Sequence, residues 1–173
     1  MVSSTVTEGA ERHAGRLEEL YQRHAPGAVR LAYLVTSDRE LSRDIAQDAF
    51  VRVAGRFRHL RFPDAFDAYL RRTVVNLCMS HFRHERVERE YVQRESMAAA
   101  GVEEQPELGA RDELRRALQR LTARQRAAIV LRYYEDLPEE EVAAEMGCSV
   151  TAARSLVSRG METLRTIVRS EDR

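Results

Sequence analysis

Apolar residues recur at intervals of three and four along most of the chain, the spacing expected of helices that bury one face. The first stripe predicts a helix over residues 16–35. Ser37 and Glu40 then stand at capping-box spacing, which predicts the start of a second helix. After a Pro-Asp pair, a third stripe predicts a helix over residues 64–88. The first half of the chain is therefore expected to form a helical bundle.

The polar faces of the second and third helices carry the candidate chemistry of this half. The second helix has a dense charged and amide surface, formed by Arg43, Asp44, Gln47, Asp48 and Arg52. The third helix mixes guanidinium groups with short polar side chains, at Arg71, Arg72, Asn76, Ser80 and Arg83. Arginine contacts phosphates and asparagine pairs with base edges, so this third face suits a polyanion with exposed bases. A solvated helix face is the alternative interpretation.

Residues 89–111 lose the helical period and gain Gly and Pro, which predicts a linker. Asp112 is then expected to cap a short helix, and Thr122 with Gln125 has the spacing of a second capping box. The helix after this box is predicted to turn four side chains inward: Ala127, Val130, Leu131 and Tyr134.

The last segment has the pattern of a helix-turn-helix motif. Pro138 opens a helix whose first turn holds three Glu, and Gly147 is placed to end that helix in a left-handed conformation. Ser149 is placed to cap a final helix. Small polar residues and Arg stand near the start of this final helix, as a helix lying in the DNA major groove requires. A generic helical hairpin is the alternative interpretation.

Composition favours an all-α chain of two small helical domains joined by a flexible linker. The 173 residues are 43% hydrophobic and 32% charged, enough for one modest core or two small ones. An aromatic content of 6%, with eight Gly and four Pro, argues against a turn-rich β fold. The net charge is zero but segregated: plus five over residues 49–89, minus four over 90–110 and plus five over 111–134. This alternation indicates two basic modules around an acidic linker.

Several classes of function lack their sequence features. The chain has no apolar signal-peptide core and no run near the roughly 20 apolar residues of a membrane span, so we expect a cytoplasmic protein without membrane insertion. Cys78 and Cys148 lie far apart without CxxC pairing, which indicates neither a disulfide framework nor a zinc site. Cys78, His81 and His84 share one helix, but their offsets sweep around it, so no metal site is expected. Phosphate-loop, dinucleotide and hydrolase motifs are missing too, so we expect no enzyme, no cofactor and no small-molecule substrate.

The motifs of both halves together resemble the extracytoplasmic-function (ECF) group of bacterial RNA polymerase sigma factors, in an actinobacterial-like form. The stretches RDIAQDAFVRVAGRF and DAYLRRTVVNLCMSHFRHER are similar to the family's region 2. The stretch LQRLTARQRAAIVLRYYEDLPEEEVAAEMGCSVTAARSLVSRGMETLR is similar to its region 4. The resemblance implies a flexible tail at 1–15, region 2 at 16–88, a linker at 89–111, region 4 at 112–169 and a tail at 170–173.

The resemblance also implies a role for each polar face. It implies that a surface on the second helix docks on core RNA polymerase. This surface consists of Asp44, Gln47, Asp48 and Arg52. It implies that the third helix reads the opened minus-10 promoter element through Arg71, Arg72, Asn76, Ser80 and Arg83. It implies that the final helix contacts the minus-35 promoter duplex through Ser149, Thr151, Arg154, Ser155 and Arg159. An anti-sigma protein that packs between the two modules is a further expected partner.

Four positions depart from the family pattern. Tyr69 stands where Trp is usual, Pro138 replaces a Ser or Thr cap, and Leu156 stands where Arg is common. Arg154 replaces Lys, which keeps the charge and changes the donor geometry. These departures bear on the promoter sequence more than on the function.

A stand-alone helix-turn-helix regulator, which binds DNA without polymerase, is the alternative function. Such a regulator needs no docking face on the second helix. It would bind its operator alone, typically as a dimer on palindromic half-sites.

Overall fold

The structure, a computed structural model, is built from helices, as the sequence predicts. It describes the backbone of residues 3–57, 64–95 and 110–171, and the side chains of residues 18–56, 66–88 and 113–167. The elements are α1 (Ser3–Thr36), α2 (Arg39–Phe57), α3 (Asp64–Glu95), α4 (Ala110–Gln119), α5 (Ala123–Ile129), the π-helical turn η1 (Val130–Tyr134), α6 (Glu139–Met146) and α7 (Val150–Glu171). No strand occurs in the described backbone, so the expected all-α class is confirmed.

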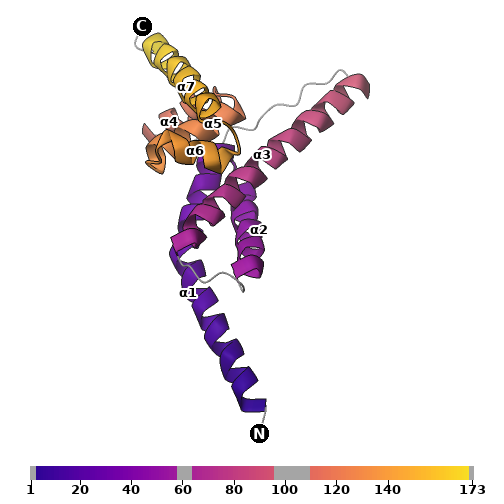
Figure 1. Cartoon of the computed structure of the whole chain (residues 1–173). Coiled ribbons are helices and arrows are strands. Elements are labelled where there is room, and N and C mark those ends of the chain that lie inside the picture. The colour runs from indigo at the N-terminus through magenta and orange to yellow at the C-terminus, as the bar shows by residue number, and fades with distance from the viewer. Residues whose placement is uncertain (1–2, 58–63, 96–109, 172–173) are drawn as a thin grey trace.

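Helices α1, α2 and α3 pack against one another and form the first module (Figure 1). The fully buried side chains that the three helices share include Leu31, Val35, Val53, Phe66 and Val74. Tyr21 lies at the edge of this core and packs edge-to-face on Phe50, with ring centroids 4.9 Å apart. Cys78 is wholly buried in the same core, and burial raises the pKa of its thiol to about 12.

The second module consists of α4 to α7, with α5 and α6 both packed on α7. Thr122 and Gln125 form the predicted capping box: the Gln125 amide donates to Thr122 Oγ1 at 3.3 Å, and the Thr122 amide donates to Gln125 Oε1 at 3.1 Å. Gly160 lets α7 approach α5 closely, because a Cβ atom at this position would lie 3.0 Å from Ile129. The predicted short helices of this half are thus held by caps and close packing.

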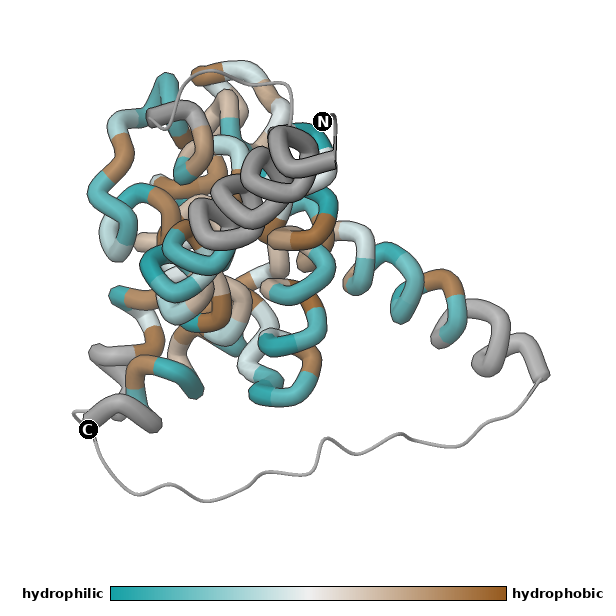
Figure 2. The backbone as a smooth tube through the Cα atoms, turned by 90° about the horizontal axis from the view of Figure 1, so that it is seen from below, coloured by the Kyte–Doolittle hydropathy of each residue, from teal (hydrophilic) through white to brown (hydrophobic). Residues whose placement is uncertain are grey.

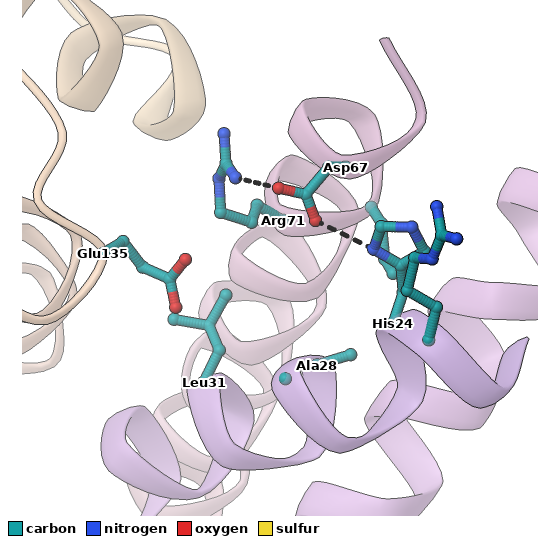
Figure 3. A pocket seen from close by; sticks show the side chains of 9 residues that line it. His24, Ala28, Leu31, Asp67, Arg71 and Glu135 are labelled. Carbon is teal, nitrogen blue, oxygen red and sulfur yellow. Dashed lines mark hydrogen bonds and ion pairs between the residues drawn. The ribbon is translucent and has the colours of Figure 1, made fainter. Parts of the chain in front are cut away.

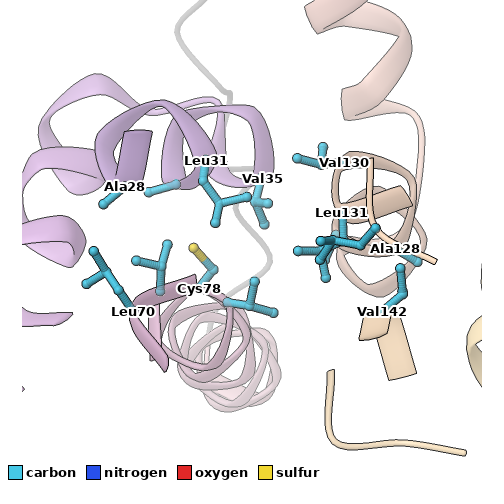
Figure 4. Close-up of a cluster of buried hydrophobic side chains, with 14 of the residues drawn as sticks. Ala28, Leu31, Val35, Leu70, Cys78, Ala128, Val130, Leu131 and Val142 are labelled. Atoms are coloured by element: carbon cyan, nitrogen blue, oxygen red, sulfur yellow. The ribbon is translucent and has the colours of Figure 1, made fainter. Parts of the chain in front are cut away.

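The two modules also pack on each other. Helix α6 contacts α3, while α5 and η1 contact α1. Figure 4 shows apolar side chains of α1 and α3, among them Leu31, Val35 and Cys78, opposite Val130 and Leu131 of η1. The buried apolar residues of both modules therefore form one continuous cluster.

Two helix starts differ from the sequence prediction. Ser37 does not cap α2; it ends α1 with a φ of 61°, and its amide donates to the Tyr33 carbonyl at 2.7 Å. Asp38 takes the capping role, since its Oδ1 accepts from the Leu41 amide at 2.9 Å. The predicted cap at Asp112 is also wrong, because α4 already begins at Ala110. The turn between α1 and α2 has only two residues, so Ser37 ends α1 and Asp38 caps α2.

Two helices are longer than their apolar stripes. Helix α1 begins at Ser3, so that residues 3–15, predicted as a flexible tail, are helical. Helix α3 continues to Glu95, seven residues into the predicted linker. Extending an existing helix costs less than starting a new one, and Arg, Glu and Gln of residues 89–95 favour helix. The remainder of the predicted linker, residues 96–109, lies outside the described part of the chain.

Tyr134 was predicted to point inward, but 46% of its surface is exposed. The helix widens at η1, where the Glu135 amide donates to the Val130 carbonyl, five residues earlier, at 3.1 Å. The extra residue in this turn changes the face on which the following side chains lie. Tyr134 consequently meets Arg30 of α1, whose guanidinium donates to its hydroxyl at 3.1 Å.

Figure 2 shows apolar positions gathered where the helices meet, and mostly polar ones on the end of α3 that projects from the body. Within the described residues, no helix is both long and apolar enough to cross a bilayer.

Candidate functional site

The outer face of α2 is an exposed polar surface. All four predicted docking residues lie on it, namely Asp44, Gln47, Asp48 and Arg52. Arg52 donates from Nε and from one terminal nitrogen to the two Asp48 carboxylate oxygens, each at 2.9 Å. The Asp48 hydrogen bond and charge raise the pKa of Arg52. Two opposite charges are thus held in a fixed orientation on a face open to solvent.

Val51 lies on the same surface, and sequence reasoning did not single it out. Its side chain is 64% exposed, next in the chain to Arg52 and one turn after Asp48. The signal was available, because Val51 is an apolar residue outside the buried stripe of its helix. It adds an apolar contact point to a face that is otherwise charged.

Four of the five predicted minus-10 residues share one stripe of α3. Arg72, Asn76 and Arg83 are exposed, and Ser80 is half-buried between them. The spacing of four, four and three residues places them on one helix face. This stripe offers guanidinium donors at both ends and an amide between them.

Arg71 is the exception, since the structure places it against the second module. Its side chain is only 16% exposed. One terminal nitrogen donates to Asp67, and Nε lies 3.7 Å from Oε1 of Glu145 in α6. The five residues that the sequence grouped together therefore do not form a single open surface.

In the helix-turn-helix, Gly147 and Ser149 perform the structural roles that the sequence predicts. Gly147 ends α6 with φ 60° and ψ 42°, a left-handed conformation that suits glycine. Ser149 Oγ accepts from the Ala152 amide at 3.2 Å and caps α7. Pro138 stands at the N-cap of α6 without a side-chain hydrogen bond. The turn therefore fixes how α7 leaves α6.

The predicted minus-35 residues differ in how far their side chains are already engaged. Ser155 is half-buried and donates to the Thr151 carbonyl at 2.9 Å. Arg154 is exposed and holds Glu139 of α6 through Nε and a terminal nitrogen, at 2.8 and 2.7 Å. This contact lowers the pKa of Glu139 and raises the pKa of Arg154. Arg159 is exposed as well, and its Nε donates to the Ser155 carbonyl at 3.3 Å.

Two of the departures from the family pattern have local compensation. Tyr69 is half-buried on the core, and its hydroxyl accepts a hydrogen bond from Arg56. The same guanidinium lies 5.8 Å from the centre of the Tyr69 ring. Leu156 is half-buried and packs on the core of the second module, so α7 gains an apolar contact where an arginine is common.

Arg126 is a structural residue to which sequence reasoning gave no role. It is 8% exposed and donates to the carbonyls of Leu118 at 2.9 Å and of Val35 at 2.7 Å, with longer bonds to Gln119 and Leu121. Its guanidinium also lies 5.8 Å from the Phe82 ring centre. Burial lowers the pKa of Arg126. This side chain donates to helix-end carbonyls of both modules at once. The sequence gives no sign of this role, because the Val35 carbonyl is distant in the chain.

Among the described residues, no group of three His, Cys, Asp or Glu side chains could hold a metal ion. Cys78 and Cys148 are both free thiols.

Comparison with known proteins identifies both modules. The family described as "Sigma-70 region 2" matches residues 20–87, and the family described as "Sigma-70, region 4" matches residues 111–164. The chain is 31% identical over 156 residues to RNA polymerase sigma-E factor of Streptomyces avermitilis, covering 90% of this chain and 86% of that protein. It is also 31% identical over 156 residues to ECF RNA polymerase sigma factor SigE of Mycolicibacterium smegmatis, covering 86% of this chain and 60% of that protein.

The fold agrees with these relatives. The structure is similar to sigma factor RpoE of Bartonella quintana, solved in complex with the anti-sigma factor NepR. The TM-score is 0.69 at 21% sequence identity, over 88% of this chain and 96% of that chain. With both regions matched in order and relatives aligned over most of its length, this chain belongs to the ECF sigma factors of RNA polymerase.

Proposed function

We propose that this chain binds core RNA polymerase reversibly and directs transcription initiation at promoters that carry matching minus-10 and minus-35 elements. The observation that carries the proposal is the pairing of region 2 and region 4 on one chain, as in the sigma factors that it matches. Synthesis of RNA is the work of the polymerase, in the cytoplasm. The chain supplies contacts rather than catalysis.

Helix α2 is the proposed docking surface for core polymerase. Asp48 and Arg52 offer a carboxylate and a guanidinium in fixed orientation, and Val51 adds apolar area at their side. A protein interface gains orientation from such charges and affinity from apolar contacts. Asp44 and Gln47 extend the same face by one turn.

Helix α3 is the proposed reader of the opened minus-10 element. Arg72 and Arg83 are exposed for phosphate contacts, and the Asn76 amide between them is exposed for a base edge. Ser80 adds a hydroxyl on the same stripe. Arg71 joins this set when the second module does not cover it.

Helix α7 is the proposed reader of the minus-35 duplex. Thr151, Arg154 and Arg159 are exposed near its start, where a recognition helix meets base edges and phosphates. Ser149 holds the first turn, and Ser155 bonds back to the helix backbone. These two hydroxyls shape the helix as well as its surface.

An anti-sigma protein is the proposed regulator. A structural neighbour, RpoE, was solved with the anti-sigma factor NepR, and its fold matches this chain in both modules. Purification of the tagged chain from its native host is expected to recover a stoichiometric partner that blocks transcription with core polymerase. Recovery of the chain without such a partner contradicts this part of the proposal.

Run-off transcription with purified core polymerase on a pool of genomic promoters tests the main proposal. New start sites that need this chain are expected, and their shared sequences would define both promoter elements. No new transcripts, together with specific duplex binding by the chain alone, would instead establish the stand-alone regulator. A Glu19→Arg variant is the matched control for changes in α2, since Glu19 is exposed on α1 outside the proposed surfaces.

A further inference from the structure

The contact between α6 and α3 places a carboxylate of the second module on a promoter-reading residue of the first. Glu145 is buried in α6, with 7% of its side chain exposed, and its Oε1 lies 3.7 Å from Nε of Arg71. That separation allows charge attraction but is too long for a hydrogen bond. Glu145 Oε2 and Arg71 Nε find no hydrogen-bond partner among the described residues. The closed contact therefore buries a charge pair and leaves one polar atom of each side chain without a hydrogen bond.

The groups that face Glu145 do not compensate for its burial. Arg71 and Arg72 of α3 attract its negative charge, whereas Asp67 of α3 and Glu141 of α6 repel it. Removal from water is the largest of these influences, and burial raises the pKa of Glu145 to about 7. The neutral acid is consequently the form that suits the closed contact.

A second carboxylate of this junction has a related environment. Glu135, which follows η1, lines a cavity of about 170 Å³ together with Arg23, His24, Asp67 and Arg71. Figure 3 shows Glu135 across this cavity from the Arg71–Asp67 ion pair, with His24 bonded to Asp67 at 3.2 Å. Burial raises the pKa of Glu135, while Arg71 opposes this and Asp67 adds to it. Closing the modules thus confines two carboxylates near one arginine.

We propose that the packing of α6 on α3 is an autoinhibitory closure, in which Glu145 covers Arg71 and ionisation of Glu145 loosens the contact. This inference rests on the proposed function of α3 as promoter reader. In the closed form DNA cannot reach Arg71, because α6 lies where the DNA would have to bind. Opening exposes Arg71 and adds a guanidinium at the edge of the stripe that holds Arg72 and Asn76.

The direction of the pH effect follows from proton uptake. A carboxyl with an ordinary value of 4.5 in the open chain and about 7 in the closed one takes up a proton on closure. Closure is then strongest below pH 4.5, weakens as the pH rises, and is weakest above pH 7. Opening is favoured on the alkaline side of neutrality.

Intramolecular energy transfer on the full chain measures the closure directly. One dye is attached at Glu19→Cys in α1 and the other at Ser158→Cys in α7, both exposed positions, in a Cys148→Ser background with the buried Cys78 retained. The closed-to-open ratio is expected to fall by about tenfold or more between pH 5.5 and pH 8.5. A ratio that stays constant over this range overturns the proposal.

The Glu145→Gln variant assigns the effect to one group. It keeps the shape of the side chain and removes its charge, so the chain is expected to remain closed at pH 8.5 and to lose most of the pH dependence. Glu140→Gln is the matched control, since it removes an exposed carboxylate from the same helix and should behave as the parent chain does. Equal pH profiles for all three chains overturn the role of Glu145.

Transcription with core polymerase separates this inference from the proposed function. Glu145→Gln is expected to slow initiation several-fold at limiting core concentration, whereas Glu140→Gln is not. Promoter-specific transcription with no difference between these variants would remove the closure and leave the proposed function standing. A pH-dependent closure without any specific transcription would contradict the proposed function and leave only the pH-dependent contact between the modules.

Discussion

Two arginine–carboxylate pairs of this chain have the same chemistry and opposite surroundings. Arg52 and Asp48 lie on α2 with 60% and 46% of their side chains exposed, and they meet through two hydrogen bonds of 2.9 Å. Arg71 and Glu145 lie between α3 and α6 with 16% and 7% exposed, and they meet at 3.7 Å. The open pair is fully hydrogen-bonded, whereas the buried pair is not.

Burial, rather than proximity, decides what each carboxylate does. Water still solvates the pair on α2, so its charges remain available to a partner and contribute little to folding. At the junction, the loss of water outweighs the attraction of Arg71, and the pKa of Glu145 rises to about 7. The exposed pair belongs to the proposed docking surface, and the buried pair is the proposed proton-sensitive contact.

The largest expected effect comes from a third arginine, Arg126, which is buried without a carboxylate. Arg126→Ala removes hydrogen bonds to carbonyls at the ends of α1 and α4 and leaves these acceptors buried. We expect the free energy of unfolding to fall by about 3 kcal/mol, measured by urea denaturation. Arg124→Ala, an exposed position on the same helix, should change it by less than about 0.5 kcal/mol. Similar losses for both variants would show that the buried carbonyl contacts are not what stabilises the junction.

The next effect is the pH dependence of folding. Because the closed chain holds Glu145 with a pKa of about 7 against 4.5 when exposed, its contribution is most favourable below pH 4.5 and is lost as the pH rises through 7. Between pH 5 and pH 8 the parent chain should lose about 2 kcal/mol more stability than Glu145→Gln does. Parallel pH curves for the two chains would mean that Glu145 is solvated in the folded protein.

A charge reversal on α2 tests the exposed pair of Asp48 and Arg52. Asp48→Arg should weaken binding to core polymerase by about tenfold or more while leaving the thermal midpoint nearly unchanged. The double variant Asp48→Arg with Arg52→Asp restores an ion pair on α2 but presents inverted charges. Fluorescence anisotropy with core polymerase should show that the double variant binds as poorly as the single one. Recovery of binding would indicate that the pair matters only within the helix.

The smallest effect is expected at the contact between α6 and α7. Glu139→Gln loosens Arg154, since Glu139 accepts a hydrogen bond from Arg154 Nε and forms an ion pair with its terminal nitrogen. Affinity for a minus-35 duplex should rise by about two- to threefold, because an exposed pair contributes little. Titration of labelled duplex with holoenzyme measures this change. A decrease in affinity would show that Glu139 positions Arg154 for DNA instead of competing with it.

Local signals in the sequence predicted some caps correctly and misplaced those at Ser37 and Asp112. Thr122 with Gln125, Gly147 and Ser149 each perform the predicted role, because a cap depends on neighbours within a few residues. The misplaced cap at Ser37 is a local error of one residue, in a turn where both Ser37 and Asp38 could serve.

The junction between the modules lay beyond sequence reasoning. Sequence reasoning groups Arg71 with Arg72 and Asn76 as polar residues of one helix, but Arg71 lies off their stripe, and the packing of α6 covers it. Arg126 reads as one more arginine of a basic segment until the Val35 carbonyl, 91 residues away in the chain, is placed beside it. Tyr134 depends on a π-helical turn that has no simple periodic signature. Each of these features needs a partner that is distant in sequence or a change of helical register.

Cys78, in the core of the first module, can serve as a chemical probe of opening. Cys78 has no exposed surface, and its thiol stays protonated at any ordinary pH because its pKa is about 12. An alkylating reagent reacts with thiolates, so it can modify Cys78 only after the first module or its junction with η1 opens and the thiol meets water. In a Cys148→Ser background, the rate of alkylation therefore reports how readily the core around Cys78 opens.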